Sequence, residues 1–195
     1  LNGNATLNLT GANTLAGLAY TSSGGVGNPT VNTGGVLTLT GSITSTPSNV
    51  AVVPQLNGTL NLNGQPAASI SVAAHADGNY VNNATPLNGL TIGAVIQNGG
   101  LTKTGTGVLN VTGNNTFTGQ LTVAQGVLNV DNVNNVSTNG RLGNNASSVS
   151  LGGTGTTGTL EYTGGNLTSN KPLTMATGGT GEVQVDNTAT TLTLS

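Results

Sequence analysis

Apolar and polar residues alternate along much of this chain. Leu109-Asn110-Val111 is a typical triplet, in which two apolar residues flank a polar one. Successive side chains of an extended strand point to opposite sides, so such triplets predict strands with one apolar and one polar face. No stretch keeps apolar residues at helical spacing, and Gly, Asn and Thr, which make up nearly half of the chain, are weak helix formers. The sequence therefore predicts an all-β protein.

The triplets recur at an even spacing in the middle of the chain. Leu90, Leu109 and Leu128 each begin one, and they are 19 residues apart (109 − 90 and 128 − 109). We expect these leucines to stack in one inward column, with Asn110 and Asn129 on the outer side. A strand repeated in this way predicts a solenoid, in which each coil lies about 4.8 Å above the previous one.

A second ladder indicates that each coil holds more than one strand. Leu101, Leu121 and Leu142 interleave with the first ladder at spacings of 20 and 21 (121 − 101 and 142 − 121). A fourth triplet begins at Val149, and we expect it to continue the column of Leu128. At roughly 20 to 25 residues per coil, the chain would form roughly eight to ten coils.

We expect residues 1–195 to form a single β-solenoid rod. The N-terminal half is less regular, because its triplets are unevenly spaced. We therefore expect loop insertions near 42–54 and 74–86 that bulge from the rod. Loops on one face of a solenoid are where binding usually occurs.

The composition separates this chain from ordinary globular domains and from disordered chains. Only 4% of its residues are charged, against about 25% in an average domain. Disorder usually requires low hydropathy and a high net charge, whereas the net charge here is −2 and the mean hydropathy is +0.03. Large side chains are few, so the core must be thin, as it is between stacked coils.

The same composition excludes several functions. No window is strongly basic, so nucleic acid is not expected as a partner. No apolar run approaches the roughly 20 residues of a membrane helix, so no membrane segment is expected in this chain. The chain has no cysteine, which excludes a disulfide framework and a thiolate metal site.

The most specific motif is a module at residues 99–130. From Gly100 it runs GLTKTGTGVLNVTGNNTFTG, and it continues from Leu121 with LTVAQGVLNV. This run resembles the autotransporter-associated β-strand repeat, also called the passenger-associated transport repeat, of bacterial secreted and surface proteins. The resemblance implies a right-handed parallel β-helix, an extracellular or cell-surface location, and a passenger role without catalytic residues.

A β-helix enzyme acting on polysaccharides is the main alternative, and it would need paired carboxylates. The acidic residues are Asp77, Asp131, Glu161, Glu182 and Asp186. Glu182 and Asp186 lie on one predicted strand and share a face, but they are about 13 Å apart at roughly 3.3 Å per residue. That separation is too large for a catalytic pair. We therefore expect no two carboxylates to face each other at catalytic range, and we assign no catalytic residue.

Metal binding and ice binding are further alternatives. His75 and Asp77 can share a face, but they supply only two of the four ligands that zinc prefers. An ice-binding face needs a regular threonine ladder. The outward positions of the expected column are Thr91, Asn110, Asn129 and Ser150. We therefore assign no metal site, no cofactor and no cofactor-binding residue.

The sequence favours a non-enzymatic structural segment, acting as a passenger stalk, an adhesin scaffold or a self-assembling extracellular fibre subunit. Neither end resembles a polar cap, and residues 191–194 read Thr-Leu-Thr-Leu, a complete strand with the core alternation. An uncapped edge leaves backbone groups ready to pair. We expect as partners copies of this chain end to end, or further repeats of the same precursor, with a surface receptor or a glycan at the loops.

Overall fold

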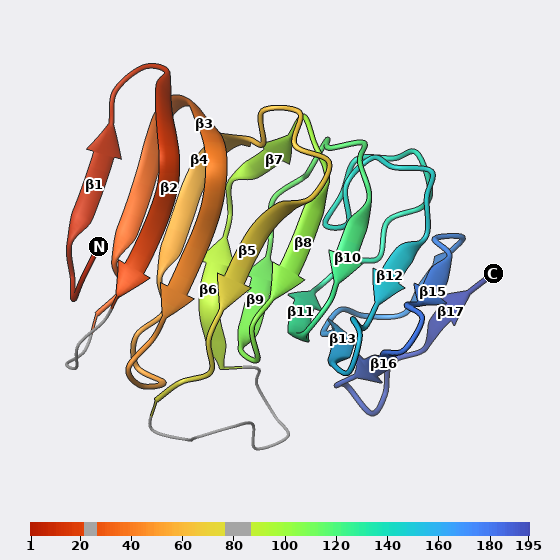
Figure 1. Ribbon diagram of the computed structural model, residues 1–195. Coiled ribbons are helices and arrows are strands. Elements are labelled where there is room, and N and C mark those ends of the chain that lie inside the picture. Colours follow the sequence, from red (N-terminus) through yellow and green to blue (C-terminus); the bar gives the residue numbers. More distant parts are fainter. Residues whose placement is uncertain (22–26, 77–86) are drawn as a thin grey trace.

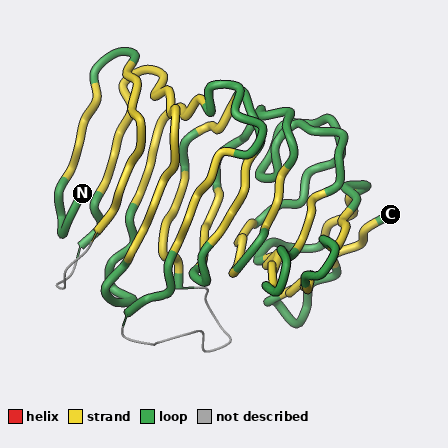
Figure 2. The backbone as a smooth tube through the Cα atoms, viewed as in Figure 1, coloured by secondary structure: helices red, strands yellow, loops and turns green. Residues whose placement is uncertain are grey.

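The computed structural model describes residues 1–21, 27–76 and 87–195. These residues form seventeen strands joined by loops and turns (Figure 2). The described residues contain no helix that could span a membrane. The strands pair in parallel and stand side by side from the N-terminal end to the C-terminal end (Figure 1). The parallel β-helix predicted from the alternating triplets is therefore confirmed.

One side of the solenoid, which we name the first face, carries one strand from each of eight coils. Each of these strands is hydrogen-bonded to the next one along the axis of the rod. They are β1 (Thr6–Leu9), the start of β3 (Thr30–Thr46), the start of β4 (Gln55–Asn61), β6 (Asn88–Ile92), β9 (Val108–Val111), β11 (Gly126–Val130), β13 (Thr157–Tyr162) and β16 (Thr180–Val185).

Further strands complete the coils. The second face holds the start of β2 (Asn13–Thr21), the middle of β3, the end of β4 and β7 (Val95–Gln97). The third face holds the ends of β2 and β3, then β5 (Ala68–Val72), β8 (Leu101–Thr104), β10 (Leu121–Val123), β12 (Val149–Leu151) and β15 (Leu173–Met175). Near the C-terminal end, β14 (Leu167–Ser169) and β17 (Leu192–Leu194) pair with each other as a separate two-stranded sheet.

Columns of apolar side chains line the interior. Leu90 pairs in register with Leu109, and Leu109 with Leu128, as their even spacing predicted. All three are buried, and Leu160 on β13 extends the same column. Stacked in this way, the side chains lose nearly all their contact with water. This burial of apolar surface is the main source of stability in so thin a core.

The loop insertion expected at 42–54 is wrong for its first five residues. Residues 42–46 belong to β3, and Ile43 is fully buried and pairs with Ile70 of the next coil. The strand is hard to detect because the next inward position is Ser45, a polar residue. Its hydroxyl is satisfied inside the rod by donating to the Gly89 carbonyl oxygen at 2.7 Å. Of the second expected insertion, 74–86, residues 77–86 lie outside the described part of the chain.

The predicted position of Val149 is also wrong. Its strand β12 pairs with β10 on the third face, whereas the strand that lies next to β11 is β13. The chain leaves the regular coil after β11 and makes a long excursion at residues 131–148, which includes Leu142. An apolar-polar-apolar triplet looks the same on every face, so a spacing close to 19 suggested the wrong neighbour.

Hydrogen bonds from asparagine side chains, rather than pairing between strands, fix the conformation of this excursion. Asn134 accepts a hydrogen bond from the Leu142 amide at 2.9 Å and donates to the Gly143 carbonyl oxygen at 2.9 Å. Asn115, from the coil before, accepts from the Ile96 amide at 2.8 Å and donates to the Arg141 carbonyl oxygen at 3.0 Å. Both asparagines are buried, so their amides satisfy backbone groups that water does not reach.

Candidate functional site

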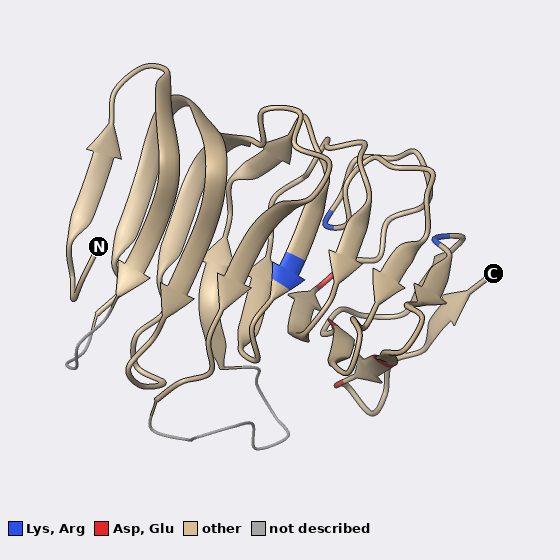
Figure 3. Ribbon diagram, viewed as in Figure 1, with Lys and Arg blue, Asp and Glu red and all other residues tan. Residues whose placement is uncertain are grey.

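Charged side chains are confined to the C-terminal part of the described chain. Lys103 is the first of them, and the strands before it carry none (Figure 3). They fall into three groupings: carboxyl groups on the outside of the first face, one exposed ion pair, and two buried lysines. Any ionic chemistry of charged side chains in the described residues must come from these groupings.

The carboxyl cluster is built by strand register. Glu161 on β13 points outward and lies between Asn129 on β11 and Gln184 on β16. The Asn129 amide donates to one Glu161 oxygen at 2.9 Å, and the Gln184 amide lies 3.4 Å from the other. The same Gln184 amide donates to Asp186 at 2.6 Å. Glu161 is only 3% exposed although it lies on the outer side of the sheet.

This setting makes Glu161 unusually basic. Burial raises the pKa of its carboxyl to about 7, the Asn129 amide opposes the rise, and a hydrogen bond to Asp186 together with the charge of Asp186 adds to it. A second carboxylate nearby disfavours the charged form of Glu161, in the same direction as burial does. The expectation that no two carboxylates face each other at catalytic range stays a prediction, but the approach of Glu161 and Asp186 was not foreseen. The pair comes from different coils, and alternation along one strand does not reveal which residue lies on the next.

The hydrogen bonds of the two carboxyls argue against glycoside hydrolysis. In glycosidases the carboxyls are about 5 to 9.5 Å apart, because the sugar and an attacking water or nucleophile lie between them. Glu161 and Asp186 instead both accept from the Gln184 amide, at 3.4 and 2.6 Å. Glu182, the other carboxylate of this strand, accepts a hydrogen bond from the Thr159 hydroxyl at 3.1 Å. The cluster links adjacent coils through shared hydrogen bonds.

The carboxyl cluster predicts a pH-dependent stability. A folded-state pKa of about 7 exceeds the ordinary 4.5, so the bound proton stabilises the fold fully below about 4.5, and this contribution is lost as the pH rises through about 7. Between these limits we expect Glu161 to change the free energy of unfolding by about 1–3 kcal/mol. Glu161→Gln should remove that pH-dependent part in denaturant titrations followed by circular dichroism. Glu182→Gln, on the next coil, is the matched control and should keep it. A Glu161→Gln profile parallel to wild type would show that the carboxyl is not proton-linked to folding.

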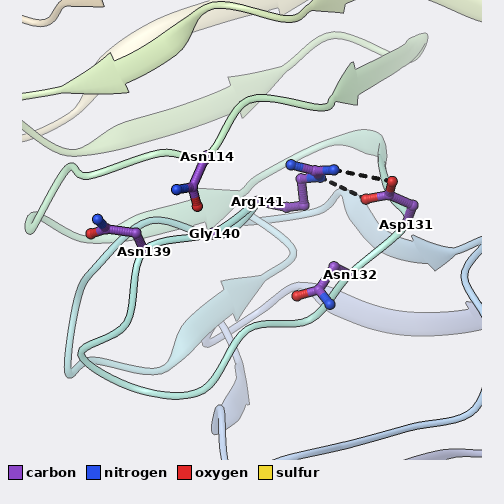
Figure 4. Close-up of a pocket in the computed structure, with 6 residues that line it drawn as sticks. All are labelled: Asn114, Asp131, Asn132, Asn139, Gly140 and Arg141. Carbon is purple, nitrogen blue, oxygen red and sulfur yellow. Dashed lines mark hydrogen bonds and ion pairs between the residues drawn. The ribbon is translucent and has the colours of Figure 1, made fainter.

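The exposed ion pair closes the base of the excursion. The Arg141 guanidinium donates to both Asp131 oxygens, from Nε at 2.6 Å and from Nη2 at 3.1 Å, and it holds the pKa of Asp131 below its ordinary value. Together they border a polar hollow of about 350 Å³ (Figure 4). Its other lining residues are Asn114, Asn132, Asn139 and Gly140. Two nitrogens of the guanidinium are already bound to Asp131 rather than directed at a ligand. The role of the ion pair is therefore to fix the conformation of the loop.

Two lysines are buried inside the rod. Lys103 occupies an inward position between Ile70 and Val123 and is fully buried. Its ammonium donates to the carbonyl oxygens of Thr104 at 2.8 Å, Gly105 at 2.7 Å and Gln125 at 2.9 Å. Burial lowers the pKa of Lys103 to about 7, whereas three carbonyl acceptors favour the charged form. The ammonium therefore clamps a corner of the coil rather than serving as a base for a substrate.

The second buried lysine repeats this arrangement further along the rod. Lys171 donates to the backbone and the side-chain oxygens of Asn145, both at 2.7 Å. Burial lowers its pKa as well. The sequence did not indicate this role for either lysine. A lone lysine at an inward strand position is the signal that could have revealed Lys103.

The metal-binding and ice-binding alternatives find no supporting site among the described residues. His75 is buried and its Nε2 lies 3.1 Å from the Leu87 carbonyl oxygen, while Asp77 lies outside the described residues. Within the described chain no three His, Asp or Glu residues gather to hold a metal ion. The outward column of the first face ends with Glu161 and Gln184 rather than Ser150, so the threonine ladder that ice binding would need is not formed there.

Comparison with known protein families gives one match, over a short stretch of the chain. Residues 101–130 match the passenger-associated transport repeat. The match covers β8 to β11 and includes the clamp residue Lys103, so the resemblance identified in the sequence is confirmed for this stretch. Neither the curated proteins nor the solved structures give a significant match.

Proposed function

We propose that this chain, which carries a passenger-associated transport repeat at residues 101–130, is a structural stalk segment of a secreted bacterial surface protein. The observation that carries the proposal is the unbroken first face, where eight coils stack in parallel through backbone hydrogen bonds. Those bonds run along the axis of the rod. Such a segment holds what lies at one end at a fixed distance from the other.

The sides of the rod support a spacer role. Among the described residues, the large apolar side chains that are exposed all lie on the last coil, at one end of the rod. The N-terminal strands carry no charged side chain. A surface without apolar patches or strong charge offers few contacts to other macromolecules. This is what a segment needs if it is to separate other parts of a protein without binding to them.

We propose further that the chain is not an enzyme. Among the described residues, the closest approach to a catalytic arrangement is Glu161 with Asp186, and both are occupied by hydrogen bonds to neighbouring amides. Incubation of the purified chain with a panel of polysaccharides should release no reducing or unsaturated ends. Activity that is lost in Glu161→Gln or Asp186→Asn would instead favour the carbohydrate-active alternative.

The surface location is tested on intact cells that make the protein. Antibody raised against the purified chain should label the outside of unpermeabilised cells, and external protease should remove the label. A cytoplasmic protein of the same cells is the control, and it should be labelled only after permeabilisation. Labelling of this chain only after permeabilisation would overturn the proposed function.

A further inference from the structure

The polar hollow beside the excursion has no part in the stalk function. It has a volume of about 350 Å³ and lies where the turn after β9 meets two segments of the excursion. In Figure 4 the ion pair of Asp131 and Arg141 lies at one end of the hollow and Asn139 at the other, with Asn114 and Asn132 between them. Pockets that bind small ligands have volumes of about 300–1,000 Å³, so the hollow has room for a small ligand.

The walls of the hollow are held in place without a ligand. Asn115 and Gly140 exchange two backbone hydrogen bonds, at 3.0 and 3.1 Å, and the Asn115 side chain donates to the Arg141 carbonyl oxygen at 3.0 Å. The buried side chain of Asn134 fills the space behind Gly140, where an added Cβ atom would come within 2.5 Å of it. The ion pair ties Asp131 to the same segment. A site that is already formed loses little conformational entropy when a ligand binds.

Several polar groups of the hollow are available to a ligand. The side chains of Asn114 and Asn132 are exposed and make no hydrogen bond within the described chain. Asn139 accepts from the Asn144 amide at 2.8 Å through its side-chain oxygen, which leaves its NH₂ group as a donor. Each Asp131 oxygen accepts one hydrogen bond from Arg141, and a carboxylate oxygen has room for a second. The hollow therefore offers both donors and acceptors.

The lining selects the chemistry of the ligand. None of the six lining residues has an aromatic or large apolar side chain, so an apolar ligand gains nothing there. The charges of Asp131 and Arg141 cancel, so a charged ligand is not attracted. A matching ligand is neutral and carries groups that donate and accept hydrogen bonds, as the amides do. A sugar presents adjacent hydroxyls of this kind on a rigid ring.

We propose that the hollow binds a neutral sugar residue through two adjacent hydroxyls, with the amides of Asn114 and Asn132 and the carboxylate of Asp131 as its hydrogen-bond partners. Arg141 holds the carboxylate in position. These hydrogen bonds replace bonds to water, so the affinity is low, with a dissociation constant of about 0.1–10 mM. The inference goes beyond the stalk function and does not depend on it, because it adds a ligand site to one side of the rod.

The experiment is a nuclear magnetic resonance titration of the ¹⁵N-labelled chain with the methyl glycosides of glucose, galactose and mannose. At least one of them should shift the side-chain amide signals of Asn114 and Asn132. Asn114→Ala and Asn132→Ala should each weaken binding about fivefold or more, because each removes a hydrogen-bonding amide. Thr118→Ala, at an exposed position of the same turn that does not line the hollow, is the control and should bind like wild type. Thermal melts confirm that the variants are folded, and the wild-type shifts locate the site independently of them.

Two further titrations define the ligand. The uronic acid of the bound sugar should bind no more tightly than the neutral sugar. A disaccharide with that sugar at its non-reducing end distinguishes two sources: equal or tighter binding identifies the end of a glycan, and weaker binding identifies a free sugar.

Three results would overturn the proposal. They are the absence of shifts at the highest soluble concentration of all three glycosides, shifts that persist unchanged in both alanine variants, and tighter binding of the uronic acid. Each of them leaves surface labelling, the test of the stalk function, unaffected.

Discussion

Lys103→Met should lower the free energy of unfolding by about 2–5 kcal/mol. Methionine keeps an apolar stem of similar length, but it removes the donors to the carbonyl oxygens of Thr104, Gly105 and Gln125. Each buried carbonyl left without a partner costs about 1–3 kcal/mol. Relief of the burial of a charged ammonium offsets part of this loss, since that burial lowers the pKa of Lys103 to about 7.

The measurement is denaturant unfolding followed by circular dichroism at a pH below 7, where the lysine is charged in the folded and unfolded states. Thr102→Met, on the same strand but facing outward, is the matched control, and we expect a change below about 1 kcal/mol. If Lys103→Met is as stable as wild type, the three carbonyls find other partners and the lysine does not clamp the corner. Because Lys103 lies within the matched repeat, the result bears on the role of this lysine in the repeat itself.

Leu109→Ala should cost about 2–5 kcal/mol, the range for removing a leucine from a packed core. Leu109 is fully buried and pairs with Leu90 on one side and Leu128 on the other, so neighbouring coils cannot easily close the cavity. Asn110→Ala, one residue along the same strand, removes a half-buried outward side chain whose hydrogen bond to the Thr91 hydroxyl is long, at 3.5 Å. We expect that variant to cost less than about 1 kcal/mol.

Urea titrations of the two variants compare the inner and outer sides of one strand directly. A larger loss for Asn110→Ala than for Leu109→Ala would reverse the assigned orientation of β9. Equal and small losses would show that this coil contributes little to the cooperative unfolding of the rod.

The regular part of the solenoid was predictable because nothing interrupts its period. Leu90, Leu109 and Leu128 follow one another with no excursion between them, so spacing alone gives their register. The excursion at 131–148 interrupts the period, so spacing no longer gives the register of the strands that follow it. It is held by amide side chains such as Asn134, and their partners are backbone groups that no sequence pattern identifies. Val149 was therefore assigned to the wrong face.

The carboxyl cluster was missed for the same reason. The approach of Glu161 and Asp186 depends on β13 being the neighbour of β11 and β16 the neighbour of β13. Because of the excursion at 131–148, that order cannot be inferred from spacing. The only distance that could be estimated was the one between two residues of a single strand. The buried lysines show a different limit. An inward lysine breaks the alternation of apolar residues, and only the carbonyls of the corner explain why it is tolerated.

Paired cysteines give the most direct test that the coils stack in the register described here. The chain has no cysteine of its own, so two introduced thiols are the only ones present. Thr122→Cys with Ser150→Cys places the thiols on adjacent strands of the third face, where residues 122 and 150 pair. A fluorogenic reagent that bridges two neighbouring thiols should cross-link this variant in the folded state and not in denaturant. Asn129→Cys with Ser150→Cys, the pairing suggested by spacing alone, should not be bridged. Efficient bridging of the second variant and none of the first would contradict the stacked solenoid as described.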